Sequence, residues 1–152
     1  MVSAGTLAPD FELGSHTGKN VKLSDFRGKQ NVVIAFHPLA FTPVCAVQMQ
    51  TYEKDKARFE KLNAHILSIS VDAGPAKKAW ADWLGGISFD LLADFHPKGQ
   101  VATDYGVMRA DGISARALFV VDKTGHITWA KLYAIPEQPD KEELFRELEK
   151  IA

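Results

Sequence analysis

The only cysteine of the chain, Cys45, follows a loop and opens a long amphipathic stretch. The first turn of a helix has unpaired backbone N–H groups and the positive end of the helix dipole, so a thiolate there is stabilised relative to its thiol. Pro43 has a φ angle close to helical and marks the helix entrance. The Thr42 hydroxyl then lies about one helical turn from the sulfur. This spacing predicts a reactive thiolate with a hydroxyl beside it.

Both residues also have a purely structural interpretation. A free cysteine usually behaves as a small buried hydrophobic residue, but Cys45 is placed at an anion-stabilising helix start rather than inside a strand. Thr42 suits the N-cap of the helix, and capping is compatible with a part in catalysis. The chemical interpretation of Cys45 is therefore favoured, and that of Thr42 remains open beside its capping role.

Length and charge limit the classes of protein to which the chain can belong. With 152 residues, 46% of them hydrophobic, the chain has the size of one domain, residues 1–152, that folds without disulfides. The formal net charge of −1 comes from interspersed charges, which disfavours a nucleic-acid partner. The sequence shows neither a targeting segment nor an apolar span long enough for a membrane. We expect a protein of the reducing cytoplasm, without a membrane partner.

The sequence gives no support for a metal or a cofactor. The histidines are scattered without helical i, i+3 or i+4 pairs: His16, His37, His65, His96 and His126. No second cysteine joins them, so a metal site is not expected. No glycine-rich loop opens a helix, so a nucleotide phosphate site is not expected either. We expect no cofactor and no metal.

The elements around Cys45 predict where it lies. The apolar runs 31–36 and 64–71 are typical of parallel strands covered on both faces, and 31–36 is expected to be the central strand. Residues 45–62 between them predict one amphipathic helix, which completes a right-handed βαβ unit. Cys45 would then follow the carboxyl end of a parallel strand, where open α/β sheets hold their sites.

The rest of the chain extends this sheet. Its patterns predict a hairpin over 8–23, a helix over 74–84 with Ala76, Ala79, Trp80, Trp83 and Leu84 on its apolar face, a strand over 89–93, a helix over 98–105, a hairpin of strands 116–121 and 127–133, and a C-terminal helix that begins at Asp140. This order predicts an α/β fold, a thioredoxin-like mixed β-sheet flanked by helices on both faces, with an N-terminal β-hairpin. In thioredoxins a Cys-x-x-Cys follows the corresponding strand, and Thr42 stands where the first cysteine would be.

Two motifs resemble those of a known family. The loop Pro38-x-x-x-Thr42-x-x-Cys45 resembles the active-site signature of the peroxiredoxins, which are thiol peroxidases on a thioredoxin-like fold. The segment 113–122 is similar to the one that supplies the family's active-site arginine, here Arg116. The resemblance covers nearly the whole chain and is greatest for the one-cysteine, AhpE-like branch.

The resemblance implies a role for each of four residues. Cys45 would attack the peroxide and become a sulfenic acid, and the Thr42 hydroxyl would bind the peroxide. Arg116 would stabilise both the thiolate and the charge that develops on oxygen, although an exposed charge in an irregular segment is its structural alternative. Pro38 would shield the thiolate from water.

Two residues depart from the family pattern. His37 stands where an aromatic residue is usual, and it either fills the pocket or adds a titrating charge, the former being favoured. Gln48 stands where a glutamate usually orients the arginine. Its neutral side chain leaves Arg116 less neutralised but less firmly held, and the sequence leaves the net effect on Cys45 undecided.

The sequence therefore predicts a one-cysteine peroxiredoxin that reduces hydrogen peroxide or an organic hydroperoxide. Without a resolving cysteine, the oxidised Cys45 requires an external thiol: a low-molecular-weight thiol, a thioredoxin or a glutaredoxin-like protein. The alternative is a non-enzymatic redox sensor or binding module that uses oxidised Cys45 as its signal. Apolar residues beside the site, Leu39, Phe41 and Val44, are compatible with a homodimer by analogy with relatives.

Overall fold

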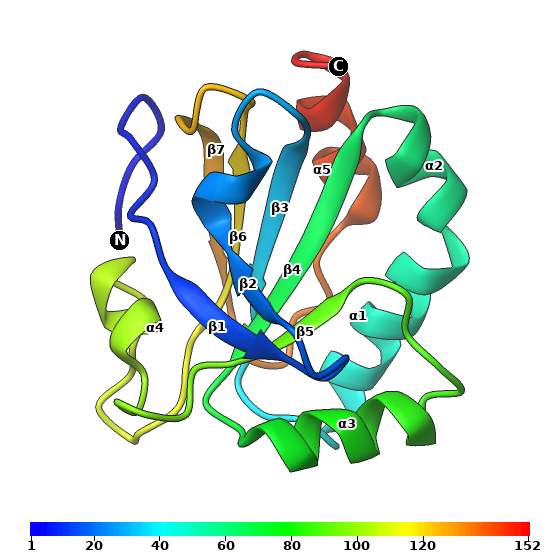
Figure 1. Cartoon of the computed structure of the whole chain (residues 1–152), viewed down its shortest axis with the longest axis vertical. Helices are drawn as coiled ribbons and strands as arrows, with labels where there is room; N and C mark the ends of the chain where they lie inside the picture. The colour runs from blue at the N-terminus through cyan, green and yellow to red at the C-terminus, as the bar shows by residue number, and fades with distance from the viewer.

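A mixed seven-stranded β-sheet with the order β2-β1-β5-β4-β3-β6-β7 organises the protein (Figure 1). The computed structural model describes all 152 residues. Its strands are β1 (Glu12–Ser15), β2 (Asn20–Lys22), β3 (Asn31–Phe36), β4 (Ala64–Ser70), β5 (Asp90–Ala93), β6 (Arg116–Val121) and β7 (Ile127–Tyr133). Its helices are the 3-10 helix η1 (Leu23–Phe26) and α1 (Pro43–Lys54), α2 (Lys56–Lys61), α3 (Gly74–Trp83), α4 (Gln100–Asp104) and α5 (Lys141–Glu149).

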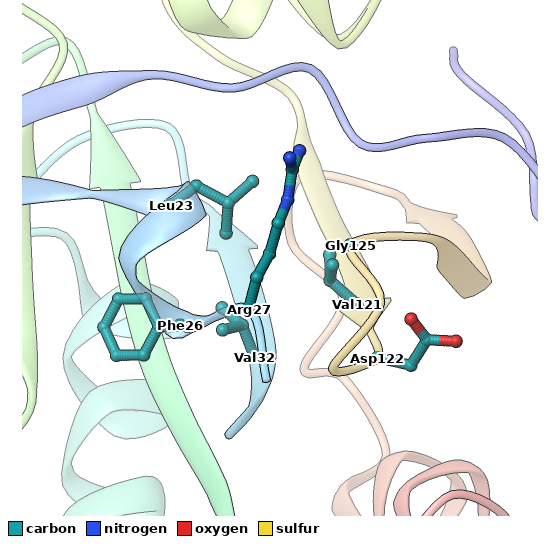
Figure 2. A pocket seen from close by; sticks show the side chains of 7 residues that line it. All are labelled: Leu23, Phe26, Arg27, Val32, Val121, Asp122 and Gly125. Atoms are coloured by element: carbon teal, nitrogen blue, oxygen red, sulfur yellow. The ribbon is translucent and has the colours of Figure 1, made fainter. Parts of the chain in front are cut away.

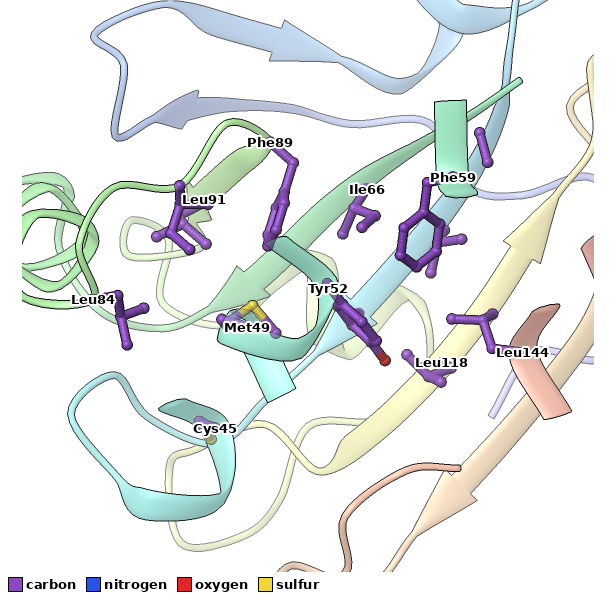
Figure 3. Packing of buried hydrophobic residues seen from close by; sticks show 14 of the residues in the cluster. Cys45, Met49, Tyr52, Phe59, Ile66, Leu84, Phe89, Leu91, Leu118 and Leu144 are labelled. Carbon is purple, nitrogen blue, oxygen red and sulfur yellow. The ribbon is translucent and has the colours of Figure 1, made fainter. Parts of the chain in front are cut away.

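The continuous apolar strands form the interior of the sheet. β3 pairs in parallel with β4 and antiparallel with β6, and every residue of β3 and β6 is buried. Side chains of a strand alternate between its faces, so each face has its own core. One core contains Val33 and Leu118 with residues of α1, α2, α3 and α5, and the other contains Ile34 and Phe119 with residues of α4 (Figures 1 and 3). The predicted fold class is confirmed.

The position of β3 differs from the prediction. β4 has three strands on each side and lies at the centre of the sheet, and β3 is its neighbour. The N-terminal hairpin is the reason, because β1 pairs with β5 and so adds two strands to that edge. β3 still lies between two strands, as its apolar sequence requires.

The single helix predicted over 45–62 is wrong, because the helix is interrupted at Asp55. Its backbone, with φ −95° and ψ 15°, ends α1, and α2 begins at the next residue. The Asp55 carboxylate accepts a hydrogen bond from Lys141 of α5 at 2.9 Å. Phe59 of α2 then packs on Phe145 of α5, with their ring centroids 4.6 Å apart. Residues at and just after the break therefore contact the C-terminal helix.

The apolar face predicted for α3 is confirmed at Trp80 and Leu84 and is wrong at Trp83. Trp80 is fully buried, but Trp83 is 64% exposed, and Lys77 is buried with no exposed surface. Lys77, Trp80 and Ala81 have i, i+3, i+4 spacing and form the face that meets the sheet. The apolar pattern of the sequence missed this phase because the predicted face contained only apolar residues and so left out the lysine.

The remaining elements agree with the predictions apart from their ends. The two hairpins, β1–β2 and β6–β7, are antiparallel, and α4 is shorter than the stretch 98–105. The Asp140 carboxylate accepts from the backbone N–H of Glu142 and caps α5, as expected. None of the helices has the length and apolar character needed to cross a membrane.

Candidate active site

The cysteine lies at the carboxyl end of β3, as predicted. β3 ends at Phe36, a six-residue loop (37–42) follows, and α1 begins with Pro43. Cys45 is thus in the first turn of α1, where the backbone N–H groups lack intrahelical partners. It has no exposed surface and belongs to the same core cluster as Met49 and Tyr52 (Figure 3). The thiol is therefore both buried and placed at the positive end of a helix.

Arg116 is brought to the cysteine by strand pairing. It is the first residue of β6, and the neighbouring pair Ala117↔Phe36 places it beside the end of β3. Arg116 is 2% exposed, and its guanidinium donates from Nη2 to Cys45 Sγ at 3.3 Å. Nε donates to the carbonyl oxygen of Ile135 at 3.1 Å. The arginine contacts the sulfur across 71 residues of sequence, so its alternative as an exposed charge is wrong.

Gln48 holds the same guanidinium from α1. Its side-chain oxygen accepts from Arg116 Nη1 at 2.9 Å, and its amide nitrogen donates to the Tyr52 hydroxyl at 3.1 Å. Burial raises the pKa of Tyr52 to about 12, so this hydroxyl stays neutral. Gln48 therefore orients the arginine through a neutral acceptor, and the positive charge that faces Cys45 is not offset by a carboxylate at this position.

Thr42 occupies the N-cap position of α1 without capping it through its side chain. Its backbone is extended, and its hydroxyl donates to the carbonyl oxygen of Leu39 at 2.8 Å instead of bonding to the helix. A hydroxyl that donates one hydrogen bond can still accept another. The loop turns sharply just before it, because Phe41 has a φ of 64° in the left-handed region, which is uncommon for a residue with a side chain. Thr42 is thus available as an acceptor beside the helix start.

Pro38 is buried in the same loop. Its neighbour His37 is also buried, and the ring centroids of His37 and Trp80 lie 5.1 Å apart. Burial, followed by the charges of Lys77 and Arg116, holds the pKa of His37 well below its ordinary value, so its imidazole is neutral. His37 therefore fills the space behind the loop, which was the favoured of its two predicted roles.

A polar network that the sequence reading missed lies behind this loop. Lys77 Nζ lies 3.0 Å from His37 Nε2 and donates to Ser70 Oγ at 2.7 Å. Ser70 Oγ donates in turn to Asp72 Oδ2 at 2.6 Å, and the same oxygen accepts from the backbone N–H of Ala40 at 2.8 Å. The network links α3 and the end of β4 to the loop that precedes Cys45.

Burial lowers the pKa of Lys77 to about 7, and the negative charges of Asp72 and Cys45 oppose this change. No linear signal distinguishes this lysine from Lys78, which is exposed and paired with Asp82. The two lysines are distinguished only by the rotation of α3 about its axis, which turns Lys77 toward the sheet and Lys78 toward solvent.

Other recesses of the molecule lie away from Cys45. The crevice in Figure 2 is lined by Arg27, Val32 and Val121 among others, at the end of β3 opposite to the cysteine loop. The described residues contain no group of histidine, cysteine and carboxylate side chains arranged to hold a metal. The buried cluster around Cys45 is therefore the candidate site.

Several known proteins resemble the chain. The model of the AhpC/TSA family matches residues 4–130. The chain is 39% identical over 133 residues to alkyl hydroperoxide reductase E of Mycobacterium tuberculosis (strain ATCC 25618 / H37Rv), covering 87% of this chain and 86% of that protein. It is 36% identical to peroxiredoxin-2 of Bos taurus, with 93% and 75% covered. The reduced 2-Cys peroxiredoxin of Plasmodium vivax superposes with a TM-score of 0.90 at 27% identity, with 98% and 81% covered.

Proposed function

This chain belongs to the AhpC/TSA family and is a thiol-dependent peroxidase of the peroxiredoxin type; we propose that its reaction takes place at Cys45, assisted by Thr42, Arg116 and Pro38. The single observation that carries the assignment is the 3.3 Å contact between Arg116 Nη2 and Cys45 Sγ, in a site where both groups are buried. Its one cysteine fits the one-cysteine mechanism expected for an AhpE-like member.

The proposed chemistry follows from the positions of the donors. The Cys45 thiolate attacks a hydroxyl oxygen of the peroxide, which keeps its hydrogen, and the O–O bond breaks. The other oxygen takes up a proton from solvent and leaves as water or alcohol. The sulfur retains the first oxygen as a sulfenic acid. Arg116 stabilises negative charge on the sulfur before the attack and on the oxygens as they separate, and Thr42 orients the peroxide by accepting a hydrogen bond from it.

Access to the sulfur requires the loop to move. Cys45 has no exposed surface, so even a water-sized molecule does not reach it in this conformation. Pro38 is buried in the adjacent loop. In the proposal Pro38 keeps bulk water from the thiolate, and small shifts of residues 37–42 admit the peroxide.

The oxidised cysteine requires an external reductant. No second cysteine exists to form an internal disulfide, so an incoming thiol attacks the sulfenic sulfur, releases water and leaves a mixed disulfide. A second thiol then frees Cys45. A low-molecular-weight thiol, a thioredoxin or a glutaredoxin-like protein is the proposed partner, in the cytoplasm, where such thiols are kept reduced.

The proposed active form is a homodimer of one-domain chains, each domain spanning residues 1–152. Large apolar side chains are exposed beside the site: Phe41 at 50%, Val47 at 51% and Trp83 at 64%. Phe41 and Trp83 contact each other, with their centroids 5.6 Å apart. Apolar side chains gathered on a surface are typical of interfaces, and a second copy would cover them next to the cysteine loop.

The test is intact-mass analysis after rapid quenching. One equivalent of hydrogen peroxide should add one oxygen atom to the protein, and peptide mapping should place it on Cys45. Excess peroxide should carry the residue on to sulfinic acid, and Cys45→Ser should gain no oxygen at this rate. Oxygen found on Met1, Met49 or Met108, with Cys45 still a free thiol, would contradict the assignment.

Turnover separates the enzyme from a redox sensor. In the presence of a thiol reductant the protein should consume many equivalents of peroxide per chain, and Cys45→Ser should consume none. A single equivalent consumed, followed by a stable oxidised protein with every thiol class tried, would instead favour the sensor.

A further inference from the structure

Lys77 is a fully buried lysine that the peroxidase chemistry described above does not use. Its ammonium has no carboxylate in direct contact, since its two partners are the neutral acceptors His37 Nε2 and Ser70 Oγ. A buried charge without a direct counter-ion is unfavourable and is retained in a site only where its environment favours it. The position of this lysine, one hydrogen bond from the residue before Pro38, indicates a use at the site.

The directions of the hydrogen bonds depend on the proton of Lys77. An ammonium can only donate, so it fixes His37 with its own proton on Nδ1 and leaves Ser70 Oγ free to donate to Asp72. A neutral amine has a lone pair, onto which the Ser70 hydroxyl can turn. Asp72 would then lose one donor, and its contact with the backbone N–H of Ala40 would be less firmly held.

The charged groups around Lys77 come from several elements. Asp72, after β4, and Cys45, on α1, favour its charged form. Arg116, on β6, acts with Lys77 to keep His37 neutral. His16, in the turn between β1 and β2, is also influenced by Lys77 and has its pKa lowered chiefly by burial. Because electrostatic coupling is reciprocal, a Lys77 ammonium that is favoured by negative charge on Cys45 also favours the thiolate.

We propose that Lys77 is a positioning residue of the peroxidase reaction: its ammonium, held between His37 and Ser70, fixes the loop 37–42 through Asp72 and Ala40, and loss of its proton reduces the reactivity of Cys45. The proposal rests on the assignment of Cys45 as the peroxide-reactive residue. It predicts that the peroxide rate per thiolate falls as the pH rises. This fall is governed by a residue that does not touch the peroxide.

The test is the pH dependence of the rate constant for hydrogen peroxide, measured by stopped-flow fluorescence and divided by the thiolate fraction. In the wild-type protein this rate per thiolate should be constant at low pH and fall about tenfold as pH rises through about 7, since a displaced loop misaligns the reacting groups. Lys77→Met should have the lower rate throughout and no fall. Lys78→Met, the matched change at the exposed neighbour, should behave as the wild type.

A second variant shifts the pH at which the rate falls, without removing the lysine. Asp72→Asn retains an acceptor for Ala40 and Ser70 but removes a charge that favours the ammonium, so the fall should move to lower pH. This variant decides the question even where Lys77→Met does not fold. A purely structural role for the network would lower the rate equally at every pH and leave the pH of the fall unchanged.

The outcomes separate this inference from the function on which it rests. A wild-type protein that oxidises at Cys45, with a rate per thiolate independent of pH, overturns the role of Lys77 and leaves the peroxidase site intact. A fall at the same pH in Asp72→Asn also overturns it. Failure of the wild-type protein to oxidise at Cys45 overturns the site and the inference together.

Discussion

Arg116 and Lys77 are two buried cations of one site, and they are held in different ways. Arg116 donates to the sulfur of Cys45, to an amide oxygen and to a backbone carbonyl. Lys77 donates to two neutral side chains and reaches its nearest carboxylate, Asp72, only through Ser70. A guanidinium remains protonated at any physiological pH, whereas burial lowers the pKa of Lys77 to about 7.

This difference is consistent with the different tasks proposed for the two cations. The planar guanidinium presents several donors at fixed angles, which suits a group that must meet developing charge directly. A titrating ammonium would be a poor choice for that position, because its charge would depend on pH. Placed behind the loop, it can instead make the geometry of the site depend on pH. Three experiments test this division, from the largest expected effect to the smallest.

The largest effect is expected for Arg116. Arg116→Met should reduce the rate constant for hydrogen peroxide on the order of 10³-fold, even at a pH where ultraviolet absorbance shows a fully formed thiolate, because transition-state charge loses its donor. Arg116→Lys should recover only part of the rate, since one ammonium does not reproduce a two-pronged donor. Arg109→Met, at an exposed arginine, is the control. Wild-type rates for the fully ionised Arg116→Met protein would limit Arg116 to stabilising the thiolate.

The next effect concerns the hydroxyl that the loop presents. Thr42→Ser retains it and should keep most of the rate, whereas Thr42→Val retains only the shape and should lose about 10²-fold in stopped-flow measurements, the cost of one transition-state hydrogen bond. Equal rates for serine and valine would mean that the bond from Thr42 to the Leu39 carbonyl serves the loop alone. Thr42 would then have no part in binding the peroxide.

The smallest expected effect is on the free energy of unfolding, and it concerns Lys77. Its pKa is about 7 in the folded protein and ordinarily 10.5, so between these values the unfolded chain binds a proton that the folded one lacks. Stability should therefore rise with pH across this window, by at most about 1.4 kcal/mol per pH unit. The range from about pH 7.5 to 9 avoids most of the histidine and tyrosine titrations, and the measurement is made with Cys45→Ser in every variant, because a cysteine ordinarily titrates near about 8.5.

Denaturant unfolding at several pH values in this range measures that slope. Lys77→Met should flatten it, and Lys78→Met should retain it. If the free energy of unfolding of Lys77→Met still rose with pH, another group would titrate in this window. The lowered pKa of Lys77, which distinguishes it from Arg116, would then be contradicted.

Local patterns in the sequence determined most of the fold and the position of the cysteine proposed as the reactive residue. Apolar runs with strand length, followed by a proline at a helix start, specify β3, α1 and the placement of Cys45 between them. Hairpin turns and the cap at Asp140 are equally local, because the residues that form them are adjacent in the chain. The Pro38, Thr42 and Cys45 spacing and the segment around Arg116 were sufficient to indicate the family.

Other features depend on contacts between distant segments. The break at Asp55 occurs where its carboxylate pairs with Lys141 of α5, 86 residues away, and the central place of β4 follows from where the N-terminal hairpin pairs. The buried state of Lys77 follows from the phase in which α3 meets the sheet, since that phase, and not hydropathy, decides which side chains face His37 and Ser70. The sequence alone could indicate the proposed nucleophile, because helix starts are local; only the tertiary structure could decide which charges surround it, because burial and distance exist only after packing.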